Sequence, residues 1–237
     1  MPGYYKTWTV LPHLPIEELT ENLWRIQGSL PNMPLKRVTT VARRENGELV
    51  IHNAMAMDEP TMTRLLAWGT PSYLLVPNGY HRLDAFAFKA RFPEIKVLCP
   101  RGSTKKVAQV VAVDGAYQDF PADDAIQLDP IPGLADAEGV MVVKSSDGVT
   151  LVFNDLLFNM PHGKGVMGLV FRHLTQSTGG PRISRLVRWF LLKDRPALRD
   201  QLLQLAATPD LRRIIVSHHR TISDDPAAVL RGVAASL

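Results

Sequence analysis

Histidine, aspartate and asparagine residues follow three predicted strands of this 237-residue chain, at the points where the strands end. These residues are Asn78, His81 and Asp84 after the apolar run 73–76, Asp155 after the run 149–153, and His218 after the run 213–216. Because pockets in layered α/β folds form at strand ends, we expect these side chains to share one pocket. An imidazole and a carboxylate that meet there can bind a metal ion or act as a general acid–base pair. Spacing alone leaves both chemistries open.

Each of these residues also has a purely structural interpretation. His81 could bond to its own loop backbone, and Asp84 is placed to cap the helix predicted after it. Asp155 could be a metal ligand, a base or the ion-pair partner of Arg82. His218 and His219 are adjacent, so they face opposite sides of an extended strand end, and we assign His218 to the pocket.

The elements that must position these residues change in kind along the chain. An antiparallel opening with a hairpin turn at Asn46-Gly47 is followed by alternating helices and strands, and a second hairpin turns at Asp147-Gly148. The predicted strands are 23–28, 37–43, 48–52, 73–76, 95–99, 126–128, 140–144, 149–153 and 213–216. Helices are predicted after 58–60 and at about 84–91, 103–111, 165–174, 183–193, 196–206 and 225–235. This order predicts a layered α/β fold, and His52 at a strand end is expected to be a hydrogen-bonded core histidine.

Composition places the chain among ordinary globular proteins. Hydrophobic residues make up 46% and charged residues 21% of the sequence, which excludes disordered and fibrous classes. Cys99 is the single cysteine, so the sequence predicts neither an internal disulfide nor a cysteine-rich zinc cluster, and a cytoplasmic location is expected. No signal peptide and no transmembrane segment are expected, because long apolar runs are missing.

The positive charge is concentrated in the last third of the chain. Residues 163–237 carry 12 Lys and Arg against 5 Asp and Glu, whereas residues 1–162 carry 15 against 18. Within this basic part, 183–193 has apolar residues at the spacing of one helix face. Such a helix can pack on its own core or on a dimer partner, or it can contact an anionic membrane through 182–193. No nucleic-acid-binding motif is found, so nucleic acid is disfavoured as a partner.

Several segments resemble the metallo-β-lactamase superfamily over roughly residues 20–220. The run DGVTLVFNDLLF at 147–158 resembles a family motif that supplies a bridging aspartate, and the ending IIVSH at 214–218 resembles its last ligand strand. The resemblance implies an αββα four-layer sandwich with two mixed β-sheets, and it puts Asp155 and His218 on ligand positions. No linker or repeat divides the chain, so we expect one domain of this type over 1–237, with the basic helices at about 164–206 as an insertion.

Other family ligand positions carry different residues. Asn78, Tyr80, Arg82 and Leu83 stand where the first motif has its ligands, and Leu134 stands where a later histidine is usual. The segment from 76 to 100 is similar to a little-characterised branch in which a Pro-Asn pair and a nearby histidine replace the metal motif. This pattern argues against the dinuclear zinc centre of the superfamily, and a guanidinium at Arg82 would repel a cation.

Three functional hypotheses follow. In the first, a remodelled site without a cofactor binds a small anionic molecule, with His81, Asp155 and His218 as the reactive groups and Asn78, Tyr80 and Arg82 as binding groups. In the second, zinc or another divalent metal is weakly held by Asp155, His218 and His81, and it supports hydrolysis of an ester, phosphoester or lactone. In the third, the basic helices form an interaction or membrane-surface module, and a homodimer would be compatible with any of the three.

Overall fold

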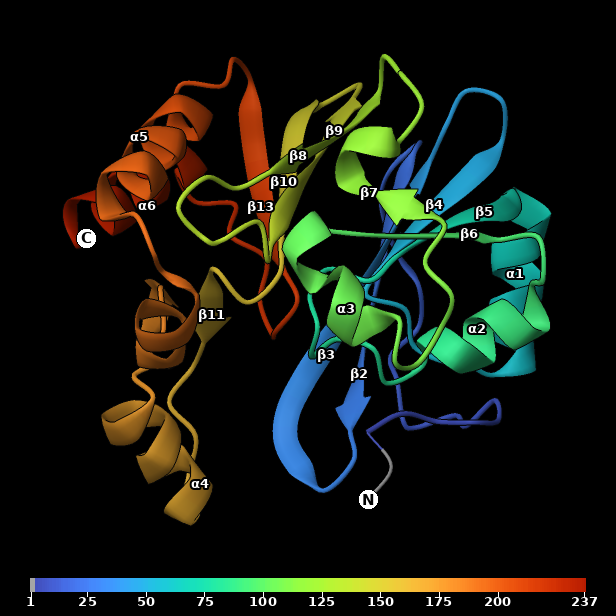
Figure 1. The fold of residues 1–237 in the computed structure, drawn as a ribbon, viewed down its shortest axis with the longest axis horizontal. Helices are drawn as coiled ribbons and strands as arrows, with labels where there is room; N and C mark the ends of the chain where they lie inside the picture. Colours follow the sequence, from blue (N-terminus) through green and yellow to red (C-terminus); the bar gives the residue numbers. More distant parts are fainter. Residues whose placement is uncertain (1–2) are drawn as a thin grey trace.

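Two β-sheets pack face to face, and helices cover both outer faces (Figure 1). The computed structural model describes residues 3–237. The first sheet has seven strands in the order β1-β2-β3-β4-β5-β6-β7, and the second has four in the order β13-β10-β9-β8. Both sheets are mixed, because β4, β5, β6 and β7 pair in parallel in the first and β13 pairs in parallel with β10 in the second. The expected αββα sandwich is confirmed.

Alternation along the strands produces the layers. In β13, Ile215 faces the space between the sheets, while Ile214 and Val216 face the outer helices. In β10, Val152 faces the space between the sheets and Leu151 faces the outer helices. Successive side chains of a strand point to opposite faces, so strands covered on both sides are apolar throughout. Three buried apolar layers therefore separate four layers of secondary structure.

Apart from β1 and β7, the strands of the two large sheets lie close to their predicted positions. Those of the first sheet are β1 (Glu17–Thr20), β2 (Leu23–Leu30), β3 (Met33–Arg43), β4 (Glu48–His52), β5 (Thr70–Leu75), β6 (Lys96–Cys99) and β7 (Gly115–Ala116). Those of the second are β8 (Ile126–Pro130), β9 (Gly139–Ser145), β10 (Gly148–Phe153) and β13 (Leu211–Val216). A small third sheet pairs β11 (Phe158–Met160) with β12 (Gly180–Arg182). The sequence patterns did not predict β1, β7, β11 or β12, because each is too short for a periodic signal.

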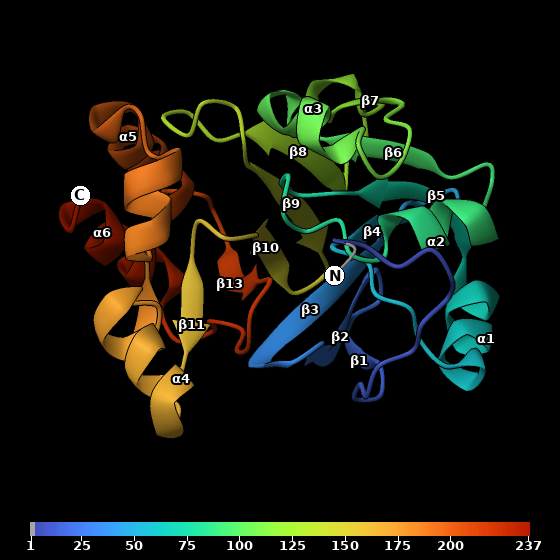
Figure 2. The same ribbon diagram turned by 60° about the horizontal axis from the view of Figure 1, so that its bottom comes forward.

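The helices fall into two outer layers and one projecting segment (Figures 1 and 2). On the first sheet lie α1 (Glu59–Trp68), α2 (Ala85–Arg91) and α3 (Thr104–Val107), and on the second lie α5 (Arg195–Ala206) and α6 (Pro226–Ala235). The projecting segment contains α4 (Gly165–Leu169), η3 (Val170–Leu174) and η4 (Val187–Leu191). None of the helices within residues 3–237 is both long and apolar enough to cross a membrane.

Two predicted helices are shorter than expected. The prediction for 103–111 was wrong in length, since α3 ends at Val107 and a turn follows. The prediction for 183–193 was also wrong at both ends. Ile183 and Ser184 lie before the helix, the Ser184 hydroxyl accepts a hydrogen bond from the Val187 N–H, and Leu192 is extended. In contrast, Asp194 caps α5 as predicted by accepting from the Ala197 N–H.

Candidate metal site

The three predicted strand ends bring His81, Asp155 and His218 together. His81 lies in the loop after β5, Asp155 follows β10, and His218 follows β13. The Nε2 atom of His81 lies 3.0 Å from Asp155 Oδ1, and the Nε2 atom of His218 lies 3.2 Å from the same oxygen. All three side chains are largely buried. The parallel pairing of β10 with β13 fixes the last two at one edge of the second sheet, and the β5 loop reaches them from the first.

Both imidazole rings are oriented by acceptors behind them. His81 Nδ1 lies 2.9 Å from Asn53 Oδ1, and the Asn53 amide is fixed because its Nδ2 donates to the Val38 carbonyl. His218 Nδ1 lies 2.8 Å from the Lys36 carbonyl oxygen, and its ring stacks on Phe158. Because both partners can only accept, each Nδ1 carries the proton. In a neutral ring, each Nε2 then presents its lone pair to Asp155.

This arrangement fits a cation. Two imidazole lone pairs and one carboxylate oxygen converge, and three acceptors at such short separations repel one another unless a proton or a metal ion lies among them. Within residues 3–237, His81, Asp155 and His218 form the one group whose ligand atoms, all within 4.8 Å of one another, could hold a metal ion. Nitrogen and carboxylate ligands with acceptors behind the histidines are typical of zinc and related divalent metals.

A second carboxylate lies behind Asp155. Burial opposes the charged form of Asp155, but the two imidazoles outweigh it, so the pKa of Asp155 is held well below its usual value. Glu138 is fully buried, and burial together with the Asp155 charge raises the pKa of Glu138 to about 8. Glu138 accepts hydrogen bonds from the Asn78 amide and from the Leu156 N–H, so it fixes the loop that carries Asp155.

Of the predicted binding residues, Asn78 has a structural position beneath the site. Its Nδ2 donates to Glu138 Oε1 and to Asp155 Oδ2, each at 2.8 Å. Its Oδ1 accepts from the Tyr80 and His81 backbone N–H groups. Asn78 therefore ties the His81 loop to Asp155, and it does so from a buried position.

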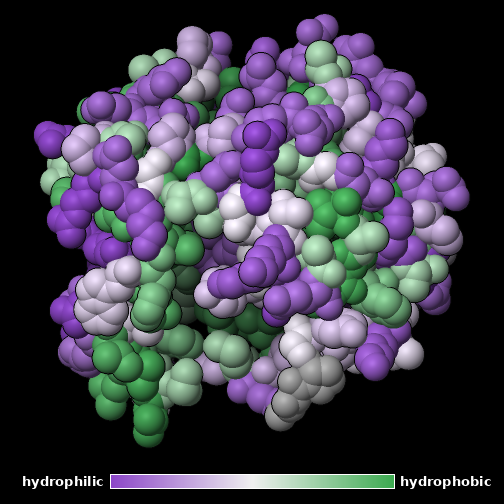
Figure 3. Space-filling view, viewed as in Figure 1, coloured by the Kyte–Doolittle hydropathy of each residue, from purple (hydrophilic) through white to green (hydrophobic). Residues whose placement is uncertain are grey.

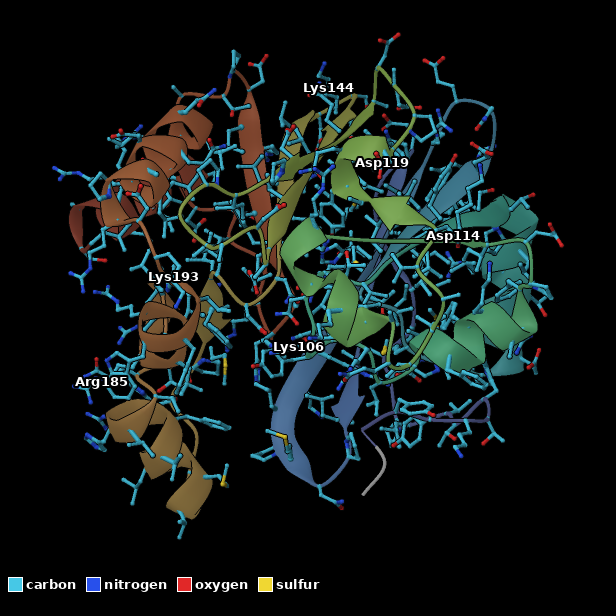
Figure 4. All side chains as sticks on the ribbon, in the orientation of Figure 1. Lys106, Asp114, Asp119, Lys144, Arg185 and Lys193 are labelled. Atoms are coloured by element: carbon cyan, nitrogen blue, oxygen red, sulfur yellow. The ribbon has the colours of Figure 1, made fainter. Side chains whose placement is uncertain are left out.

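Tyr80 and Arg82 lie farther out. Tyr80 is 66% exposed, lines the cavity described below, and accepts from Lys106 Nζ through its hydroxyl. The Arg82 guanidinium donates to the Lys106 carbonyl and to Gln109 Oε1. Of the three alternatives for Asp155, the ion pair with Arg82 was therefore wrong, because Arg82 is bonded to Lys106 and Gln109 instead. Lys106, whose carbonyl accepts from Arg82, lies on α3 and is labelled in Figure 4.

Two structural interpretations from the sequence also need correction. Asp84 begins α2, but its side chain does not cap that helix; it pairs with Arg37 and accepts from the Ala56 N–H. His52 is buried as expected, yet neither ring nitrogen has a hydrogen-bond partner within residues 3–237. Its complete burial, reinforced by the charge of His81, lowers the pKa of His52 to about 3. His52 is therefore a neutral core histidine without the partners that were predicted.

A cavity of about 610 Å³ opens over the three candidate ligands. Its walls are mostly apolar, and Figure 3 shows a hollow between the projecting segment and the β2–β3 hairpin. The apolar lining residues are Leu30, Pro31, Met33, Leu35, Ala54, Leu83, Phe158, Met160, Phe171, Leu186, Val187, Phe190 and Leu191. Besides His81, Asp155 and His218, the ionisable side chains that line it are Arg37, already paired with Asp84, and Tyr80. Leu83 is part of this wall, whereas Leu134 is buried in the core beside α5.

The sequence analysis missed Asn53 and Glu138. Asn53 directly follows β4, so the same strand-end pattern that selected Asn78 would have found it. Its left-handed backbone, with φ of 55°, also suits asparagine. Glu138 precedes β9 within Ala-Glu-Gly, and nothing in its local sequence indicates burial.

Comparison with known proteins establishes what this architecture is. No family model matches the sequence, and no curated protein matches it.

Solved structures do match this chain. The DIM-1 metallo-β-lactamase exposed to ceftazidime is 12% identical, with 96% of this chain and 99% of that chain covered and a TM-score of 0.63. A metallo-β-lactamase from Erythrobacter litoralis is 14% identical over 94% and 96% of the two chains, with a TM-score of 0.62. FIM-1 from Pseudomonas aeruginosa, in a mono-zinc form, is 13% identical over 94% and 96%, with a TM-score of 0.57. The chain has the metallo-β-lactamase fold.

Proposed function

We propose that this protein is a hydrolase that uses one divalent metal ion held by His81, Asp155 and His218. The observation that carries the proposal is the convergence of two Nε2 atoms and one carboxylate oxygen, with both Nδ1 atoms already bonded to acceptors. That the FIM-1 enzyme, a fold neighbour, is described in a mono-zinc form supports a single-ion site.

The chain's own residues prepare the site for this chemistry. A divalent cation held there would polarise a carbonyl oxygen and make water more acidic. Asn53 and the Lys36 carbonyl hold the imidazoles in the tautomer that a ligand needs, and Asn78 holds the second oxygen of Asp155. The low pKa of Asp155 keeps it ionised at neutral pH.

The cavity walls limit the substrate to molecules with an apolar part. Apolar walls exclude water and strengthen electrostatic interactions at the polar floor. We propose an ester, phosphoester or lactone as the scissile group, with its apolar portion against the β2–β3 hairpin and the projecting segment.

Elemental analysis tests this proposal. We expect protein purified without chelator, or supplied with zinc or manganese, to retain about one equivalent of metal. Asp155→Asn should lose it, and the matched surface variant Asp129→Asn should keep it. Hydrolysis of p-nitrophenyl esters, a phosphoester and a lactone should then follow metal content. No retained metal, or activity unchanged by chelator, would exclude the proposed function.

One observation favours the anion-binding hypothesis as a second candidate. The Arg37 guanidinium lines the cavity, and the described part of the chain gives it one carboxylate partner, Asp84. A carboxylate or phosphate could pair there without any metal. Calorimetric titration of chelator-treated protein with phosphate and acetate separates the two candidates: binding that Arg37→Lys weakens would favour the second.

A further inference from the structure

Exposed apolar side chains gather on the projecting segment, residues 164–193. The large ones are Val166, Met167, Leu169, Leu174, Leu186, Trp189 and Phe190. Val166 is 77% exposed, Phe190 66% and Trp189 60%, so these side chains do not contribute to the core. Figure 3 shows apolar residues at the free tip of this segment, where Figure 1 places α4. Exposed apolar side chains clustered on one segment in this way indicate an interaction site.

The same segment is strongly basic. Its charged residues are Lys164, Arg172, Arg182, Arg185, Arg188 and Lys193, and residues 164–193 contain no Asp or Glu. None of these six forms an ion pair with a carboxylate in the described part of the chain. Figure 4 places Arg185 and Lys193 on this segment, away from Asp114 and Asp119 at the other side of the molecule. The surface is therefore apolar and carries uncompensated positive charge.

The apolar surface is continuous with the mouth of the cavity. Leu186 and Phe190 are exposed, and both also line the cavity. The segment projects from the sandwich rather than covering a sheet, as Figures 1 and 2 both show. A planar surface that contacts the tip of the segment could therefore meet it without a clash from the two sheets.

The positive charge of residues 164–193 favours one kind of binding partner over the others. In a two-fold dimer through this face, the basic residues of both copies would meet, because such an interface pairs the same patch with itself. Nucleic acid would use the basic residues but would leave side chains such as Val166 and Leu169 without apolar partners. An anionic lipid surface satisfies both features, since its headgroups attract Lys and Arg while its acyl boundary accepts apolar side chains. We propose that residues 164–193 form a docking surface for an anionic lipid bilayer.

Vesicle co-sedimentation tests this docking surface without any activity measurement, so its outcome is independent of the proposed function. We expect the whole protein to bind phosphatidylcholine vesicles that contain phosphatidylglycerol at least tenfold more tightly than vesicles of phosphatidylcholine alone, and high salt should weaken the binding. Trp189→Ser with Phe190→Ser should reduce binding at least tenfold. Lys164→Glu with Arg172→Glu should do the same. Both side chains are exposed, and within residues 3–237 neither forms an ion pair that the fold would lose.

Matched controls keep the test decisive. Leu203→Ser removes an exposed apolar residue from α5, and Lys105→Glu reverses an exposed charge on α3; neither should change vesicle binding. Circular dichroism checks that each variant is folded. Equal binding to neutral and anionic vesicles, no binding to either, or equal loss in the controls would overturn the proposal. Self-association that Trp189→Ser abolishes, without vesicle binding, would assign the face to a second copy instead.

Discussion

The two sheets contribute to the candidate site in different ways. The second sheet places Asp155 and His218 directly at the ends of adjacent parallel strands, β10 and β13, and the sequence resemblance located both. The first sheet contributes through the loop after β5, where Asn78 occupies a ligand position of the resemblance and His81 lies out of register. Asn78 there acts as a hydrogen-bonding centre, and His81 reaches Asp155 instead. Under the proposed metal site, the first sheet therefore contributes His81, whose ring Asn53 orients.

The largest expected effect tests whether the two sheets contribute equally. His81→Ala and His218→Ala should each weaken zinc affinity more than about 100-fold, because each removes one of three ligands, whereas residues that only orient a ligand cost 10–100-fold. Competition with a fluorescent zinc chelator measures the affinity. His173→Ala, at an exposed position of the projecting segment, is the matched control. Retention of zinc by His81→Ala alone would show that only the second sheet carries ligands.

The first sheet also carries the unpartnered His52 at the end of β4. Its pKa is about 3 in the folded protein against 6.5 for an ordinary histidine, so between these values the unfolded chain binds a proton that the folded chain does not. Stability from this group is therefore complete above pH 6.5 and is lost as the pH falls toward 3. In metal-free protein, His52→Leu should reduce the loss of unfolding free energy between pH 7 and pH 4 by about 3 kcal/mol.

Urea denaturation at the two pH values measures this difference. His173→Leu provides a control, since His173 is exposed and its replacement should leave the pH dependence of stability unchanged. If His52→Leu and the parent protein lose equal unfolding free energy on acidification, the lowered pKa of His52 is contradicted. An internal water that hydrogen-bonds to the imidazole would then be the explanation.

Sequence patterns predicted the layers and the strand ends better than they predicted contacts between side chains of different elements. Short apolar runs and the Asn-Gly and Asp-Gly turns located β4 and β10, because burial on both faces of a strand requires apolar residues throughout it. The partners of Arg82 and Asp84 could not be predicted, since a guanidinium or carboxylate bonds to whichever group tertiary packing brings near. Local sequence indicated an N-cap for Asp84, but the buried Arg37, 47 residues away, outweighed it.

A smaller effect is expected beneath the site, where the two sheets meet through Asn78. Asn78→Ala leaves Glu138 and Asp155 without a shared donor and should lower the unfolding free energy by about 2–3 kcal/mol. Asn154→Ala is the matched comparison, because its amide donates to the same Glu138 oxygen at 3.3 Å and its Oδ1 has no hydrogen-bond partner among the residues described. That variant should cost about 1 kcal/mol. Chemical denaturation measures both, and equal costs would show that Asn78 does not link the sheets.

The smallest expected effect isolates the orientation of His81. Asn53→Gly keeps the left-handed backbone that this position requires and removes the acceptor for His81 Nδ1. Zinc affinity should fall about tenfold, because the ring loses its fixed tautomer but keeps its Nε2 ligand atom. Asn53→Asp retains an acceptor and should bind zinc at least as well as the parent, which a purely structural role for Asn53 would not produce. If both variants lose affinity equally, the Asn53 contact to the Val38 carbonyl, rather than its contact to His81, positions the loop.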